Sequence, residues 1–167
     1  RSLTLFEILD DFSSIPKNSN IISATFNIWQ YSKRNSNAKF YCQQIEDAWS
    51  PDTLKKWSKA ILLNRRPASG DGQELYSNAT LGWHSFDIRG AVNNWVNVGM
   101  SNYGLALLAL DDNATGGAFY TNDSNTGSGG QTGVTDAKKP YISITWEIPN
   151  PVDLNYDINN TTVILRP

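Results

Sequence analysis

The segment Ile22–Tyr31 carries the side chains best suited to binding a ligand. Its residues alternate between two faces, as in a half-buried strand, and one face presents Thr25, Asn27, Trp29 and Tyr31. Aromatic rings stack on the flat C–H faces of sugars, and amides and hydroxyls bond sugar hydroxyls. Rings two residues apart stand about 7 Å from each other along a strand, a spacing that suits neighbouring sugar units. We therefore predict a ligand-binding platform here, unless a loop or the C-terminal tail covers this face.

A second group of polar side chains offers ligands for a metal ion. Asp111, Asp112 and Asn113 are consecutive, and two glycines follow shortly after them. Calcium takes six to eight oxygen ligands from carboxylates, amides and carbonyls. The spacing fits no EF-hand loop, so the sequence leaves two alternatives: a structural calcium site and a solvated acidic turn.

The residues around His84 do not form a hydrolase site. Neighbouring strand residues point to opposite faces, so His84 and Ser85 cannot meet locally. The chain also lacks a Gly-x-Ser-x-Gly elbow, and no motif marks a pair of catalytic carboxylates. We expect a protein that is not an enzyme.

Composition excludes several other classes. The 167 residues carry a net charge of −2, 18% charged residues, one cysteine and one histidine. Without a basic cluster there is no nucleic-acid surface, and the longest apolar run, Leu105–Leu110, is too short to span a bilayer. One cysteine forms no internal disulfide, and Cys42, in a strand pattern, is expected in the core. The chain begins abruptly at Arg1, which suggests an excised piece and leaves export open.

The period-two patterns predict an all-β protein, an antiparallel β-sandwich with one short helix. The helix is expected at Ser50–Ala60, with Pro51 at its first position, while Gly90–Trp95 fits a short turn or helix. Loops are expected at Arg65–Asn78 and Asn122–Asp136. The predicted strands are Ile22–Tyr31, Ala38–Ile45, Trp83–Ile88, Gly104–Leu110, Ala118–Thr121 and Tyr141–Ile148.

Three further expectations concern the arrangement of these elements. The second strand is expected to pair with the first across a short loop, and Trp83, Trp95 and Trp146 are assigned to the core. Residues 1–148 would form the sandwich. Residues 149–167, which begin with a strand-breaking Pro-Asn-Pro, would form a linker to a following domain or pack on the sandwich edge.

The motifs, taken in order, resemble the DNRLRE domain family of bacterial proteins. The resemblance spans about Leu3–Glu147 and is carried by six short blocks. These blocks are Phe12–Pro16, Ser23–Phe26, Trp49–Trp57, Trp83 to Trp95, Asn102–Leu105 and the ending from Phe119 to Ile144. The resemblance implies a jelly-roll sandwich related to carbohydrate-binding modules, secreted or held at the cell wall or cell surface. It also implies a parent of the wall-associated kind, with YD repeats and a toxic C-terminal domain.

Two functions follow from this resemblance. The first is a non-catalytic, monomeric module that binds a cell-wall or extracellular polysaccharide, without nucleic acid, membrane or any cofactor beyond a possible structural calcium. The second is a structural spacer or docking module that contacts neighbouring domains of the same chain and binds no sugar. Exposure of the rings of Trp29 and Tyr31 favours the first, and their burial favours the second.

Asn-x-Ser/Thr sequons occur at Asn78, Asn113, Asn122, Asn159 and Asn160. In a chain this rich in Asn and Thr they are expected by composition, and a bacterial source would leave them unmodified.

Overall fold

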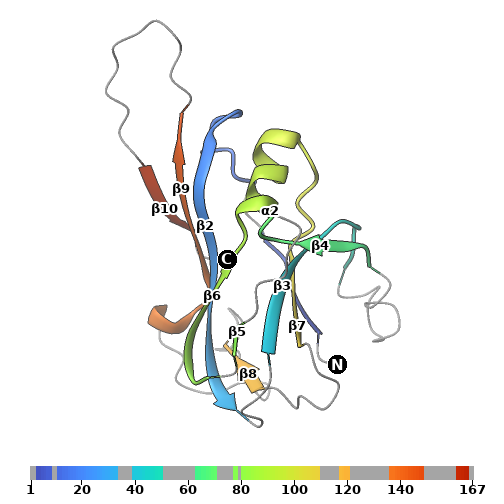
Figure 1. Ribbon diagram of the computed structural model, residues 1–167, viewed down its shortest axis with the longest axis vertical. Helices are drawn as coiled ribbons and strands as arrows, with labels where there is room; N and C mark the ends of the chain where they lie inside the picture. Colours follow the sequence, from blue (N-terminus) through green and yellow to red (C-terminus); the bar gives the residue numbers. More distant parts are fainter. Residues whose placement is uncertain are drawn as a thin grey trace, which may run out of the picture.

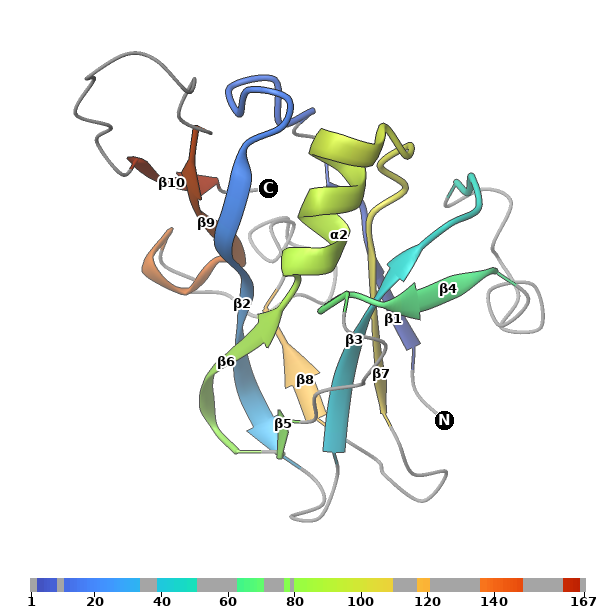
Figure 2. The same ribbon diagram turned by 45° about the horizontal axis from the view of Figure 1, so that its top comes forward.

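Two antiparallel sheets pack face to face, and one helix covers an end of the space between them (Figures 1 and 2). This computed structural model describes residues 3–8, 11–33, 39–50, 63–70, 77–78, 80–109, 117–120, 136–148 and 161–165. The all-β sandwich with a short helix that the sequence predicts is thus confirmed.

The first sheet, sheet A, has the strand order β1-β7-β3-β4, with β5 pairing β3 beside this path. The second sheet, sheet B, has the order β10-β9-β2-β6, with β8 pairing β2. The strands of sheet A are β1 (Leu3–Phe6), β3 (Lys39–Ile45), β4 (Arg65–Pro67), β5 (Ser77–Asn78) and β7 (Leu105–Ala109). Those of sheet B are β2 (Asn20–Lys33), β6 (Gly82–Asp87), β8 (Gly117–Phe119), β9 (Tyr141–Glu147) and β10 (Thr161–Leu165).

The core lies between the two sheets and follows the alternation of their strands. On β2, Phe26 and Ile28 are fully buried, and the ring of Phe26 lies 5.0 Å from that of Phe6 on β1. On β9, every second residue from Ile142 is buried, because side chains along a strand alternate between its faces. β7 is buried at four of its five residues, as the continuous apolar run predicts for a central strand.

The helix that the structure describes lies at the segment predicted to form a short turn or helix. A five-residue α2 (Arg89–Asn93) continues directly into the π-helical turn η1 (Asn94–Val98), and it ends at Gly99 in a left-handed conformation. Trp95 is buried on this helix and stacks on Phe12 at 5.3 Å. The turn-or-helix segment Gly90–Trp95 is therefore helical, whereas residues 51–60 of the predicted helix lie outside the described part of the chain.

Two predictions about the strands are wrong. β3 pairs β7, β4 and β5 in sheet A and not β2, because the connection after β2 crosses from one sheet to the other. The segment predicted as a loop, Arg65–Asn78, contributes β4 and β5, two short edge strands that pair with opposite ends of β3. Strands of two or three residues are too short for alternation to reveal them.

The tail contributes a strand to the described structure. β10 pairs β9 over five residues, from Thr161 opposite Trp146 to Leu165 opposite Ile142. This agrees with edge packing, the second alternative for the tail. The division into a sandwich at 1–148 and a linker at 149–167 stays a prediction.

We expect the thiol of Cys42 to be unreactive in the folded protein. Cys42 is 6% exposed, and burial raises the pKa of its thiol well above the usual range, so the reactive thiolate does not form. Thiol-reagent labelling at pH 8 should be negligible without denaturant and stoichiometric in guanidinium chloride. Labelling of the folded protein at the rate of free cysteine would contradict this burial.

The raised pKa of Cys42 also predicts that the stability of the fold depends on pH. Above about pH 8.5 the unfolded thiol loses its proton while the folded one keeps it, so the unfolded state binds fewer protons. The contribution of Cys42 to the free energy of unfolding is therefore complete below that pH and falls as the pH rises. Chemical denaturation should show that the free energy of unfolding falls more between pH 8 and pH 10 in the wild type than in Cys42→Ala.

Candidate functional site

The outer surface of sheet B carries a cluster of aromatic side chains, which we call the aromatic face. It consists of Trp29 and Tyr31 on β2, Trp83 on β6, Tyr141 at the start of β9, and Tyr120 just after β8. Trp29 stands directly opposite Trp83 in the strand register, and their rings meet edge to face at 5.5 Å. Trp83 also meets Tyr141 at 5.2 Å, and Tyr31 stacks on Tyr120 at 4.6 Å. Sheet pairing therefore joins residues far apart in the sequence into two groups of contacting rings, and β2 contributes one residue to each group.

Trp29 and Tyr31 do lie on the outer side of β2, as the alternation predicts, but they are neither fully exposed nor covered. Both side chains are half-buried. The ammonium group of Lys138 lies 4.9 Å from the ring centre of Trp29, a cation–π distance. Each ring is therefore engaged by a neighbour.

The polar residues of the predicted platform bond to one another. Asn27 Nδ2 donates to Thr25 Oγ1 at 3.0 Å, and Asn27 Oδ1 accepts a hydrogen bond from Ser85 on the neighbouring strand. Asn27 is 7% exposed and Thr25 is half-buried. Their hydrogen-bonding groups are thus used within the sheet, and the aromatic rings form the accessible part of this surface.

Trp83 does not belong to the core, and this prediction is wrong. It is 41% exposed, whereas His84 and Phe86 on the opposite face of β6 are buried. His84 fills the inner position because its ring lies among those of Phe40, Phe86 and Phe119, and its Nε2 bonds to the carbonyl oxygen of Thr80 at 2.7 Å. Trp95 and Trp146 are buried as predicted.

This placement also separates the residues of the apparent hydrolase motif. His84 points between the sheets, while Ser85 is exposed on the outer surface and bonds to Asn27. The imidazole and the hydroxyl therefore lie on opposite sides of β6, as predicted, and they cannot act as base and nucleophile.

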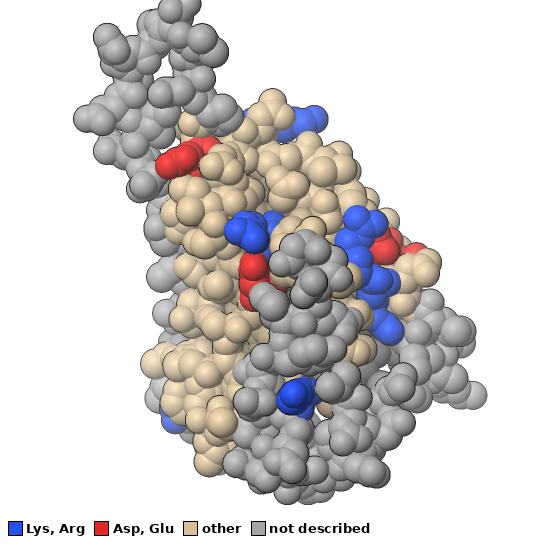
Figure 3. Space-filling view, in the orientation of Figure 1, with Lys and Arg blue, Asp and Glu red and all other residues tan. Residues whose placement is uncertain are grey.

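Charged groups are few among the described residues of the aromatic face. Lys138 stands beside Trp29, and Asp87 ends β6, where its carboxylate accepts a hydrogen bond from the backbone N–H of Arg89. Figure 3 shows, from the view of Figure 1, that charges of both signs occur in small groups separated by uncharged surface. Arg66 and Glu46 form an ion pair.

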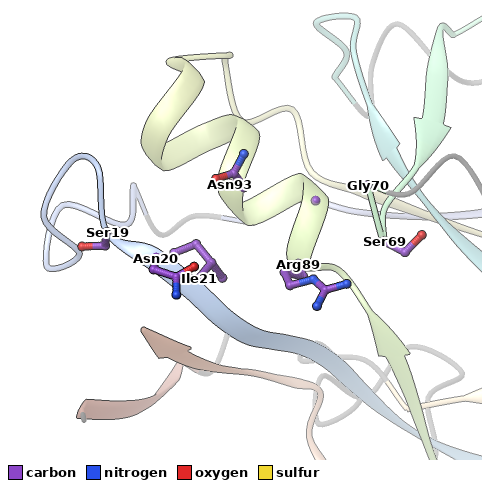
Figure 4. Close-up of a pocket in the computed structure, with 8 residues that line it drawn as sticks. Ser19, Asn20, Ile21, Ser69, Gly70, Arg89 and Asn93 are labelled. Atoms are coloured by element: carbon purple, nitrogen blue, oxygen red, sulfur yellow. The ribbon is translucent and has the colours of Figure 1, made fainter. Parts of the chain in front are cut away.

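A pocket of about 320 Å³ opens beside the helix, between the start of β2 and the turn at Ser69 (Figure 4). One of its backbone donors is already used, because Gly90 N donates to Ser69 O at 3.0 Å. The Arg89 side chain lies near Asp87, with 3.9 Å between Nη2 and Oδ2. The pocket is lined by Ser19, Asn20, Ile21, Ser69, Gly70, Arg89, Gly90 and Asn93. It has no paired acid and base, and we assign no chemistry to it.

The predicted metal ligands, Asp111, Asp112 and Asn113, lie outside the described residues, so the calcium site stays a prediction. Elsewhere, the described residues contain no group of three or more His, Cys, Asp or Glu placed to hold a metal ion. They also contain no helix long and apolar enough to cross a membrane.

A family model described as TGF-beta propeptide matches residues 6–143 of the chain. The match leaves out β10, the first three residues of β1 and the last four residues of β9, and it covers the other strands of both sheets. No curated protein and no solved structure matches the chain. Propeptide domains of this family are non-catalytic, in agreement with the expectation from the sequence, and the precursors that contain them are secreted.

This match overturns the resemblance to the DNRLRE domain. The blocks behind that resemblance are short strand and turn patterns, which a β-sandwich of another family can carry as well. The functions derived from it are wrong as well, both the polysaccharide-binding module of a wall-associated bacterial protein and the spacer of a YD-repeat toxin. So is polysaccharide as the partner, since a propeptide domain implies a growth factor. The chain belongs to the TGF-beta propeptide family.

Proposed function

We propose that this chain is the propeptide domain of a secreted precursor, and that it binds the mature growth-factor dimer of that precursor and keeps it latent. The observation that carries the proposal is the family match over residues 6–143, which spans most of both sheets. A domain without catalytic groups acts by binding alone. Latency then depends on how much of the receptor-binding surface of the growth factor the domain covers.

The chemistry of the chain favours a non-covalent complex. Its single cysteine is buried between the sheets and keeps its proton, so it is not presented to a partner for a disulfide. Retention of the growth factor through these residues then depends on the dissociation constant. When the free concentration of the domain is 100 times the dissociation constant, about 1% of the growth factor stays unbound, which is sufficient for latency.

We propose the aromatic face as the surface that contacts the growth factor. Aromatic side chains are enriched in protein–protein interfaces, and charged residues are depleted at the centre of such interfaces. Trp83 is 41% exposed, and Leu81, two residues earlier, is 64% exposed, so two large apolar side chains lie together at the β6 edge of this surface. With few charges among its described residues, the face suits an apolar, uncharged protein surface better than an anionic glycan or a nucleic acid.

Binding of purified growth-factor dimers tests the proposal. The probes are the dimer of the same precursor and mature TGF-beta, immobilised for interferometry with the 167-residue chain in solution. We expect a dissociation constant of about 1–100 nM, the range of standard-sized protein interfaces, and loss of growth-factor signalling in a reporter cell assay.

Because the described residues of the aromatic face carry few charges, the affinity for the growth factor should change less than about threefold between low and high salt.

The matched control for the binding measurement is the heat-unfolded chain. A folded chain that binds neither dimer at 10 µM would overturn the proposal.

The sequence also predicts a location at a cell surface, which is more specific than secretion. We propose that the latent complex is retained there, and fractionation of cells that express the precursor tests this by comparing the medium with the cell surface.

A further inference from the structure

A lysine side chain lies against the aromatic face, at the point where the chain enters β9. The helical turn η3 (Asp136–Lys138) comes just before that strand and is the orange turn ahead of β9 in Figure 1. Pro140, between this turn and β9, is fully buried, and Tyr141 belongs to the aromatic face. The ammonium group of Lys138 lies 4.9 Å from the centre of the Trp29 ring. The fold therefore places one positive charge directly against an aromatic ring of this surface.

Among the residues that the structure describes, Lys138 has no carboxylate beside it. The acidic residues Asp87 and Glu147 end β6 and β9. In the strand register Asp87 lies opposite Thr25, which is about 13 Å from Trp29 along β2. Glu147 lies opposite the first residue of β2, farther still from Trp29. The ring of Trp29 is therefore the partner that the described structure gives to this ammonium group.

A protein that covers the aromatic face also covers Lys138. The lysine side chain is already half-buried, and a partner packed on the rings of Trp29 and Trp83 removes further water from its ammonium group. Burying a charge costs free energy unless an opposite charge or hydrogen-bond acceptors compensate it. The ring occupies one side of the ammonium group, and N–H donors on the other side remain for an acceptor of the partner. A carboxylate supplies both the opposite charge and the acceptors.

We propose that Lys138 determines the specificity of the aromatic face, because it pairs with an acidic side chain of the growth factor. This inference rests on the proposed function, in which the aromatic face is the contact surface. The partner surface is then apolar opposite the rings and carries one aspartate or glutamate opposite Lys138. A growth factor without an acidic residue at that position leaves the ammonium group buried and unpaired, and should therefore bind less tightly.

Substitutions of single lysines test this proposal through the affinity for the growth-factor dimer of the same precursor, measured by interferometry. We expect Lys138→Gln to raise the dissociation constant about fivefold or more, and Lys138→Arg, which keeps the charge, to change it less than about threefold. Lys17→Gln is the matched control, because it removes the same charge from an exposed lysine in the turn before β2. The start of β2 lies about 30 Å from Trp29 along the strand, so this variant should stay within about twofold of the wild type.

Thermal unfolding separates a loss of recognition from a loss of fold. Lys138→Gln removes one partly exposed cation–π contact, so it should lower the unfolding midpoint by no more than about 4 °C. A lysine that only supports Trp29 would lower the midpoint without weakening the binding of the folded variant. Equal affinities of folded Lys138→Gln and Lys17→Gln would overturn the proposal.

A double-mutant cycle identifies the acidic partner. Each aspartate and glutamate of the growth factor is replaced in turn by its amide, and each variant is measured against the wild type and against Lys138→Gln. One of these substitutions should weaken binding to the wild type about fivefold or more and change binding to Lys138→Gln less than about twofold. If no acidic residue shows this coupling, recognition of a carboxylate is wrong while the proposed function stands. A wild-type chain that does not bind the dimer contradicts the proposed function itself, and this inference with it.

Discussion

Replacing Gly104 with alanine should destabilise the fold by about 3 kcal/mol or more, from left-handed strain together with overpacking. Gly104 precedes β7 with φ +87°, and a Cβ built on it would lie well inside 3.0 Å of the carbonyl oxygen of Phe6. Both groups are backbone, so neither can rotate away. The clash would displace β1, which pairs with β7 through Phe6 and Leu105, and with it the ring of Phe6 in the core.

Gly99→Ala is a matched control for this change. Gly99 has a similar φ of +81°, but a Cβ there meets nothing within 4 Å. It should therefore cost only the strain of the left-handed conformation, about 1–2 kcal/mol. Thermal unfolding should show a midpoint lowered by about 6–12 °C for Gly104→Ala and by clearly less for Gly99→Ala. Equal midpoints for the two variants would show that β1 does not approach Gly104 as described.

Replacing Trp83 with alanine should weaken binding of the growth factor by about 30-fold or more, the effect of losing an interface hot spot of about 2 kcal/mol. Trp83 is the most exposed large aromatic residue among those described, and its ring contacts both Trp29 and Tyr141. Because it is partly exposed, its removal should lower the free energy of unfolding by only about 1–2 kcal/mol.

Two variants distinguish this loss of contact from a loss of fold. Val98→Ala removes another exposed apolar side chain, 63% exposed at the end of the helix and away from the aromatic face, and should leave the affinity unchanged. Trp146→Ala removes a tryptophan that is 6% exposed, and it should cost about 3–5 kcal/mol of stability. Unchanged affinity in folded Trp83→Ala would exclude the aromatic face as the contact surface and leave the latency proposal to be tested elsewhere on the domain.

The sequence predicted the elements whose alternation is long and regular. β2 and β9 each alternate over seven or more residues, and the structure places their inward residues in the core. Ile148, which was also expected inward, follows the end of β9 and is 49% exposed. The buried run of β7 and the burial of Cys42 follow from the same local patterns. In such strands the residues next to each position are enough to predict which face its side chain occupies.

The family could not be predicted from these local patterns. The blocks taken for a DNRLRE domain are strand and turn patterns, which describe a β-sandwich without specifying which sandwich it is. A fold of this class carries many functions, so neither the partner nor the bacterial source followed from it. The match to the TGF-beta propeptide model uses residues 6–143 together and not block by block.

The sequence by itself determined the class of fold, the lack of a catalytic motif and the outer position of Trp29 and Tyr31. Only the tertiary structure decided which sheet each strand joins and which side of β6 faces the core. Local alternation defines two faces of β6, and it places Trp83 on the face opposite to Phe86 and Ile88. The inward assignment of Trp83 came from the resemblance to the DNRLRE pattern, and the structure corrects it. Pairing with β2 sets Trp83 opposite Trp29 on the outer surface, while the rings of Phe40 and Phe119 enclose His84. These contacts join residues distant in the chain, and no local pattern contains them.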